Sequence, residues 1–164
     1  MSNRRLDITP VSSPLKAAFA ISRGSKTSAE TVRVRVQQGD RTGWGECVPY
    51  GRYGETIESV TATIETLREA LEAGLTRADL QAQMPAGAAR CAADCALGDL
   101  EAKMTGTPVW QLAGLPEPKP VETAVTVSLD TPEKMAEAAR AIRGQLLKLK
   151  LGGAEDLKRI EAVH

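Results

Sequence analysis

The chain has 164 residues, enough for one domain or slightly more, and 42% of them are hydrophobic although only 3% are aromatic. This composition predicts a soluble globular protein with an aliphatic core. The 21 basic and 21 acidic residues cancel, and so few aromatic side chains offer little for base stacking. Neither nucleic acid nor a membrane is therefore expected as a partner. Residues 1–7 lack the apolar core of a signal peptide, so a cytoplasmic location is expected.

The first part of the chain predicts an antiparallel three-stranded meander. Segments 4–11, 30–37 and 41–48 have the composition of strands. The middle segment alternates valine with polar residues, so one of its faces is expected in the core and the other in solvent. The residues Gln38-Gly39-Asp40 predict the hairpin turn into the third strand.

Helices are predicted after the meander. Apolar residues recur at three- and four-residue spacing from Ile57 to Leu71, which predicts one helix that ends at Gly74. A short helix near 76–83 and a longer one over 87–104 follow. The proline-rich stretch 115–120 cannot be helical and predicts a semi-rigid linker.

The cysteines predict no metal centre. Cys47, Cys91 and Cys95 are an odd number, and the only histidine is His164. A metal site needs more ligands than these, so we expect reduced, buried thiols that act as small hydrophobic side chains.

The last part of the chain alternates strand and helix patterns. Strands are predicted over 121–129 and 145–151, and helices over 131–143 and 153–164. A β-α-β-α series of this kind is typical of a parallel sheet that is covered by helices.

Two lysines lie on one face of the second of these strands. Side chains alternate along a strand, so Lys148 and Lys150 point together and the neighbouring leucines point the other way. On an edge strand such lysines are merely solvated. Inside a parallel sheet they are costly without a partner or a function. The glycines 152–153 place Lys150 at the carboxyl end of its strand, where α/β folds keep their active sites. A second cation nearby lowers the pKa of a lysine and so favours the neutral amine, which can act as a base.

Four stretches of the sequence together resemble the enolase superfamily. They occur in the family's order as GWGECVPYGRYGET over 43–56, ALGDLEAK over 96–103, TAVTVS over 123–128 and KLK over 148–150. The resemblance is to the muconate-lactonising branch, and most closely to the dipeptide epimerases that act on L-Ala-D/L-Glu. It implies an α+β capping domain over 1–113, a linker over 114–120, and the first βαβα of a TIM-like (β/α)7β barrel over 121–164.

The resemblance also implies roles for individual residues. Lys150 matches the base that removes the α-proton of a carboxylate substrate. Lys148 matches the lysine that tunes the pKa of this base and contacts the carboxylate. Thr126 matches a substrate-contacting threonine of the epimerases, although a threonine in a strand is equally well explained by β-propensity.

A substrate-covering loop is expected over residues 22–28. In the family this capping-domain loop closes over the substrate, and here Arg23 and Lys26 suit capture of a side-chain carboxylate. The alternative is a solvated loop with two charges. Tyr53, together with Tyr50 and Arg52, is expected to line the same pocket.

Part of the family's machinery is not in this sequence. Members of the superfamily hold Mg²⁺ with three acids on later barrel strands, and the epimerases carry a second catalytic lysine. All of these positions would follow His164. Two parallel strands cannot close a barrel, so we expect a fragment of a longer enzyme, or a missing half that comes from another chain.

The expected activity is that of an isomerase: epimerisation of a small dipeptide by Mg²⁺-assisted abstraction of the α-proton with lysine bases. Alternatives are another reaction of the same branch, such as cycloisomerisation or o-succinylbenzoate synthesis, and a non-catalytic half-barrel module that needs a partner chain. The oligomeric state is left open, and a homo-oligomer is compatible with the sequence.

Overall fold

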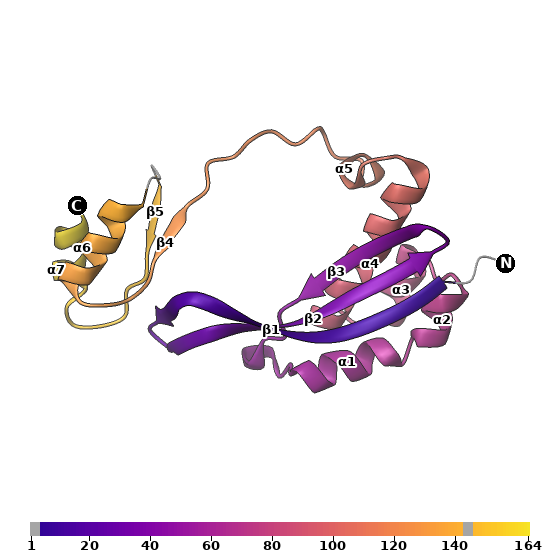
Figure 1. The fold of residues 1–164 in the computed structure, drawn as a ribbon, viewed down its shortest axis with the longest axis horizontal. Coiled ribbons are helices and arrows are strands. Elements are labelled where there is room, and N and C mark those ends of the chain that lie inside the picture. The colour runs from indigo at the N-terminus through magenta and orange to yellow at the C-terminus, as the bar shows by residue number, and fades with distance from the viewer. Residues whose placement is uncertain (1–3, 143–145) are drawn as a thin grey trace. The chain divides into compact units, whose positions relative to one another are not determined.

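The computed structural model describes residues 4–142 and 146–164, and these form two compact units (Figure 1). Unit 1 consists of residues 4–13 and 30–118. Unit 2 consists of residues 14–29 and the described residues from 119 onward. Each unit is described by itself below.

The predicted three-stranded antiparallel sheet is confirmed. Its strands are β1 (Arg4–Ile21), β2 (Gly24–Gln38) and β3 (Arg41–Cys47), in the order β1-β2-β3. Antiparallel register pairs Val34 with Gly45. The core face of β2 is the predicted one, because its alternating valines are at most 1% exposed: Val32, Val34 and Val36.

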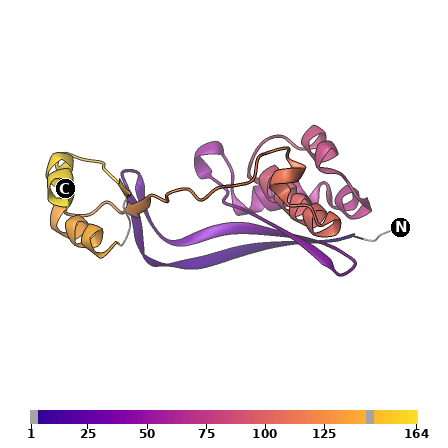
Figure 2. The ribbon, with the colours of Figure 1, turned by 90° about the horizontal axis from the view of Figure 1, so that it is seen from above.

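The first two strands are much longer than predicted, and the expectation of a loop over 22–28 is wrong. β1 and β2 run alongside each other as a long hairpin (Figure 2), and only Ser22 and Arg23 form the turn between them. Lys26 therefore lies in β2. The prolines Pro10 and Pro14 did not end β1 because it is an edge strand, where a missing N–H donor is tolerated.

The helix predicted from Ile57 to Leu71 is broken in two. Helix α1 (Ile57–Glu65) begins at a capping box between Thr56 and Ser59, and α2 (Arg68–Ala73) ends at Gly74 in the left-handed conformation, as predicted. The break lies at Thr66 and Leu67, where the Thr66 hydroxyl donates to the Thr63 carbonyl at 2.7 Å. Such side-chain bonds compete with the helical ones and loosen the helix.

The other helices of unit 1 are close to prediction. Helix α3 (Arg77–Gln83) and helix α4 (Ala88–Thr105) match the predicted segments, whereas the short helices η1 (Gly51–Tyr53) and α5 (Val109–Leu112) were not expected. The helices bury their apolar faces on the valine face of the sheet, around fully buried side chains such as Ile64, Leu71, Leu80 and Leu100.

Helix α4 packs unusually close to β3. A Cβ atom on Gly45 would lie 1.9 Å from the carbonyl oxygen of Ala92, and one on Gly43 would lie 2.1 Å from that of Ala96. Only glycine fits at these two positions. The same helix also protects the edge of the sheet: Asp99 accepts from the Trp44 N–H at 2.8 Å, and Lys103 donates to the Thr42 carbonyl at 2.8 Å. Several residues of the GWGE and ALGDLEAK stretches thus serve to pack α4 on β3.

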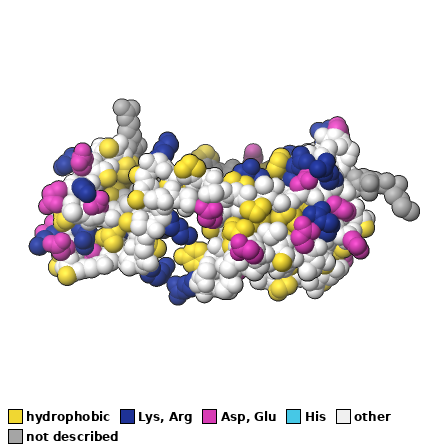
Figure 3. All heavy atoms as spheres, turned by 60° about the horizontal axis from the view of Figure 1, so that its bottom comes forward, with side chains coloured by type: hydrophobic (Ala, Val, Ile, Leu, Met, Phe, Trp, Pro, Cys, Tyr) yellow, Lys and Arg dark blue, Asp and Glu magenta, His cyan; other side chains and the backbone are white. Residues whose placement is uncertain are grey.

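The solvent face of the sheet carries paired charges. Arg35 donates two hydrogen bonds to Asp7, at 2.9 and 2.6 Å, which lower the pKa of Asp7 below its ordinary value. The guanidinium of Arg35 also lies 5.9 Å from the centre of the Trp44 ring. On the face shown in Figure 3, acidic and basic side chains are interspersed.

Unit 2 contains the predicted β-α-β-α series in a shorter form. Strands β4 (Val125–Val127) and β5 (Leu147–Leu149) are parallel, and α6 (Pro132–Ala141) and α7 (Asp156–Val163) follow them. Residues 143 and 145, predicted as a helix end and a strand start, lie outside the described residues. The small core of this unit consists of Val127, Met135 and Ala136.

The cysteine prediction is partly wrong. Cys47 is buried as expected, but Cys91 and Cys95 are exposed free thiols on α4. Helix α4 turns its alanines toward the sheet, so the cysteines fall on its outer side. Among the helices of the described part of the chain, none is long and apolar enough to cross a membrane.

Candidate active site at the ends of the parallel strands

The two lysines lie at the carboxyl end of the parallel strand pair in unit 2. Lys148 is opposite Thr126 in the register, so their side chains share a face of the pair. Lys150 follows β5 directly, and its N–H donates to the Val127 carbonyl at 3.0 Å. The lysines are two positions apart along an extended segment, with Leu149 between them, which places Lys150 on the face of Lys148 and Thr126. This placement agrees with the expectation from the sequence.

The opposite face of the strands explains this orientation. Val127 is 1% exposed, and α6, whose Met135 is also 1% exposed, packs against β4. Leu147 and Leu149 are partly buried on the same side. The apolar alternation therefore faces the helices, and the lysines and Thr126 are left on the other face.

The tip of the β1–β2 hairpin packs against these strand ends within unit 2. The N–H of Leu129, two residues after β4, donates to the Ala20 carbonyl at 3.2 Å. The ammonium of Lys150 lies 5.7 Å from the centre of the Phe19 ring, within cation–π range. A Cβ atom on Gly152 would lie 2.5 Å from the Cβ of Ser22, so the hairpin turn approaches the loop after β5 closely.

The glycine turn after Lys150 is held by Asp156 at the start of α7. The carboxylate of Asp156 accepts from the N–H groups of Gly152 and Gly153, each at 3.1 Å. These two bonds, aided by Arg159, lower the pKa of Asp156 below its ordinary value. The turn that carries the chain away from Lys150 is thereby fixed in shape.

Arg23 and Lys26 both belong to the hairpin tip. Arg23 is exposed in the turn between the strands, and Lys26 is exposed on β2. Both lie in unit 2 with Lys148 and Lys150. The structure therefore assigns these two candidate anion-binding residues to the segment that covers the strand ends.

Tyr53 belongs to unit 1, whereas Lys148 and Lys150 belong to unit 2. It ends η1 and is 76% exposed, with its ring centre 5.6 Å from that of Tyr50. Both tyrosines line a hollow of about 990 Å³ beside β3 and the start of α4. Glu55 shapes this hollow, because its carboxylate accepts from the N–H groups of Tyr50 at 3.1 Å and Ala88 at 2.7 Å. Burial raises the pKa of Cys47, which also lines the hollow, to about 11.

Phe19 and Ala20 contribute to the site but were not predicted from the sequence, and the close approach of Gly152 to Ser22 was not predicted either. Phe19 is the only phenylalanine of the chain, which offered a weak signal. These contacts join segments about 110 to 130 residues apart, which no local pattern encodes.

The described residues do not form a magnesium site. They contain no grouping of three or more His, Cys, Asp or Glu side chains that could hold a metal ion. The donor set of residues 4–142 and 146–164 therefore does not fit a Mg²⁺ ion held by three acids.

Comparison with known proteins agrees with the fold. Residues 4–114 match the family described as mandelate racemase / muconate lactonizing enzyme, N-terminal domain, and the chain belongs to this family. Its curated and structural relatives include dipeptide epimerases of the enolase superfamily.

Three relatives illustrate the match. The L-Ala-D/L-Glu epimerase of Escherichia coli K12 is 43% identical over 154 residues, which cover 92% of this chain and 48% of the relative. An enolase family member from Agrobacterium tumefaciens with homology to dipeptide epimerases, solved with sodium, L-Ala-L-Glu and an ordered loop, is 48% identical with a TM-score of 0.90, over 98% of this chain and 49% of that one. The Cytophaga hutchinsonii dipeptide epimerase, complexed with Mg and D-Ala-L-Val, is 29% identical with a TM-score of 0.84, over 99% and 48%. The chain thus spans about half the length of the relatives it matches.

Proposed function

We propose that this chain supplies the capping domain and the first βαβα of an enzyme that epimerises dipeptides of the L-Ala-D/L-Glu type. In this proposal residues 1–113 form the capping domain, 114–120 the linker and 121–164 the start of the barrel. The observation that carries it is the position of Lys150: at the carboxyl end of β5, on the face of Lys148 and Thr126, and under the tip of the hairpin. The names of the relatives supply the substrate class.

Lys150 would act as the base on one face of the substrate. Its Nζ atom, as the neutral amine, takes the proton from the α-carbon and becomes an ammonium, while the electron pair of the broken C–H bond stays on the substrate. A base on the opposite face, outside this chain, returns a proton to give the other epimer. Lys148 and Thr126 would bind the substrate carboxylate beside the α-carbon.

The hairpin tip would select the second residue of the dipeptide. Arg23 and Lys26 are cationic and exposed there, which suits a side-chain carboxylate such as that of glutamate. Tyr53 would line the entrance from the capping domain. Mg²⁺, present in the Cytophaga complex, would have to be held by residues other than those described in this chain.

Hydrogen exchange in the full-length protein tests the role of Lys150. Lys150→Ala should abolish epimerisation in both directions, yet leave exchange of the α-hydrogen with solvent deuterium for one isomer, through the remaining base. Lys148→Ala should slow both isomers. Lys158→Ala is the matched control, because Lys158 is a 71% exposed side chain on α7 and should have no effect.

Two outcomes would contradict this assignment. Epimerisation near the wild-type rate in Lys150→Ala would make Lys150 a structural residue. Loss of exchange from both isomers, with folding intact, would indicate a one-base reaction of the cycloisomerase or synthase kind.

A substrate series tests the hairpin tip. Arg23→Ala should lower kcat/KM for L-Ala-L-Glu by a factor equivalent to about 1.5–3 kcal/mol, the range for a charged hydrogen bond, and hardly affect dipeptides with an apolar second residue. Arg41→Ala, at the start of β3, serves as the control. Equal losses on both substrate types would remove Arg23 from the specificity role.

A non-catalytic module that pairs with a partner chain is the second candidate. It is favoured by apolar side chains that unit 2 leaves exposed: Leu146 at 46%, Leu157 at 75% and Ile160 at 41%. A second polypeptide that copurifies in fixed ratio with the chain, together with no epimerase activity in the pair, would support this candidate over the first.

A further inference from the structure

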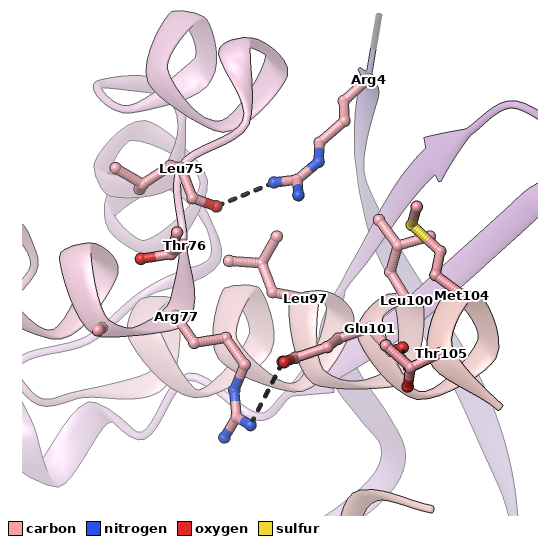
Figure 4. Close-up of a pocket in the computed structure, with 10 residues that line it drawn as sticks. Arg4, Leu75, Thr76, Arg77, Leu97, Leu100, Glu101, Met104 and Thr105 are labelled. Atoms are coloured by element: carbon pink, nitrogen blue, oxygen red, sulfur yellow. Dashed lines mark hydrogen bonds and ion pairs between the residues drawn. The ribbon is translucent and has the colours of Figure 1, made fainter. Parts of the chain in front are cut away.

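Unit 1 contains a second cavity, in addition to the hollow lined by Tyr50 and Tyr53. Neither Lys148 nor Lys150 belongs to this unit. The second cavity has a volume of about 520 Å³ and opens between the start of β1, the connection from α2 to α3, and the C-terminal half of α4 (Figure 4). Its floor is apolar, since Leu97 is 4% exposed and Leu100 is 1% exposed, and Met104 lies beside them at the rim. Small-molecule sites typically measure roughly 300–1,000 Å³ and are lined mostly by apolar side chains.

Arg4 places a positive charge at the wall of this cavity. Its Nη1 atom donates to the Leu75 carbonyl at 2.9 Å, and its Nε atom donates to the Gln38 side-chain oxygen at 2.9 Å. Both acceptors are neutral, so these bonds hold the guanidinium in place without neutralising it. Burial lowers the pKa of Arg4 below its ordinary value, because the charged form has lost part of its water. A charge in this situation is stabilised by an anionic partner.

The other polar groups of the cavity are already engaged. Arg77 donates to the carboxylate of Asp94 at 3.0 and 3.3 Å, and Glu101 lies 4.0 Å away on its other side. The Thr76 hydroxyl donates to Asp79 at 2.6 Å, and the Thr105 hydroxyl donates to the Glu101 carbonyl at 2.9 Å. Among the described residues that line this cavity, the charge that remains to be matched is that of Arg4, above an apolar floor.

We infer that this cavity binds a small organic carboxylate with an apolar tail. The carboxylate would accept hydrogen bonds from Arg4, and the tail would lie on Leu97 and Leu100 and against Met104. The inference is independent of the proposed epimerase activity, because it uses residues of unit 1 alone.

Titration of the 164-residue chain with hexanoate, followed through the methyl NMR signals of Leu97, Leu100 and Met104, tests the inference. Saturable shifts of these signals are expected. Hexan-1-ol, which has the same tail without the charge, should bind at least about tenfold more weakly, because it loses a charged hydrogen bond. Arg4→Met should reduce hexanoate affinity by a similar factor. Arg5→Met is the matched control, since Arg5 is a 70% exposed side chain that pairs with Asp7, and it should leave affinity unchanged.

A second pair of variants covers the case in which Arg4→Met does not fold. Met104 is 48% exposed, so it can be replaced without disturbing the core. Met104→Glu adds a negative charge at the rim and should abolish hexanoate binding, whereas the uncharged Met104→Gln should retain most of it. Equal binding of hexanoate and hexan-1-ol, equal affinity in the Glu and Gln variants, or no saturation with hexanoate would each overturn the inference.

Discussion

The two units of this protein differ in how much apolar surface each one buries. Unit 1 closes an α+β core in which side chains from the sheet and from α1 to α4 are fully buried. The core of unit 2 is formed by Val127, Met135 and Ala136, while leucines and an isoleucine of its strand and helix segments remain exposed. An antiparallel sheet that is covered by one layer of helices can bury its apolar face completely. Two parallel strands with two helices, by contrast, leave strand edges and apolar faces uncovered.

This difference predicts that the two units unfold separately. The largest effect on stability is expected when one buried residue in each unit is truncated. Ile64→Ala in α1 should lower the free energy of unfolding of unit 1 by roughly 2–5 kcal/mol, because Ile64 is fully buried. Met135→Ala in α6 should remove the amide protection of α6 and α7. Both tryptophans, Trp44 and Trp110, lie in unit 1, so their fluorescence in a urea titration reports on that unit.

The Met135→Ala variant also serves as the control for Ile64→Ala. Met135→Ala should leave the midpoint and slope of the tryptophan transition unchanged. If Met135→Ala shifts that transition as much as Ile64→Ala does, the two units form one cooperative system and the comparison fails.

A smaller effect is expected from the glycines of β3. Gly45→Ala should cost about 1–3 kcal/mol of unit 1 stability, because its Cβ would collide with the backbone of α4 and force the helix away from the strand. Gly51→Ala is the matched control: no heavy atom lies within 4 Å of the Cβ it would add, so its effect should stay within about 0.5 kcal/mol. Equal midpoints for the two variants in a urea titration would show that the close packing of α4 on β3 does not limit stability.

The smallest effect is expected where the hairpin tip meets the strands of unit 2. Gly152→Ala should push the turn at Ser22 away and open the hydrogen bond from the Leu129 N–H to the Ala20 carbonyl. Amide exchange at Leu129 should then become about fivefold faster, the equivalent of losing one hydrogen bond of about 1 kcal/mol. The tryptophan transition of unit 1 should not move. Unchanged exchange at Leu129 would mean that the hairpin tip does not depend on Gly152 for its position.

Local patterns of the sequence were sufficient to predict much of the fold and the lysine-bearing face of the candidate site. The alternation of Val32, Val34 and Val36 identified the core face of β2, because side chains alternate along any strand. Gly74 marked the end of α2, because glycine adopts the left-handed conformation at low cost. Lys148 and Lys150 were placed on one face at a strand end by the same alternation.

Tertiary structure alone decided how distant segments meet. The continuation of β1 and β2 to residues 21 and 24, the close packing of α4 on Gly43 and Gly45, and the position of Phe19 over Lys150 all depend on contacts between segments remote in sequence. The exposure of Cys91 and Cys95 likewise follows from which side of α4 turns toward the sheet. Periodicity states which face of an element is apolar, but the partner of that face and the distance between them are set by packing the whole chain.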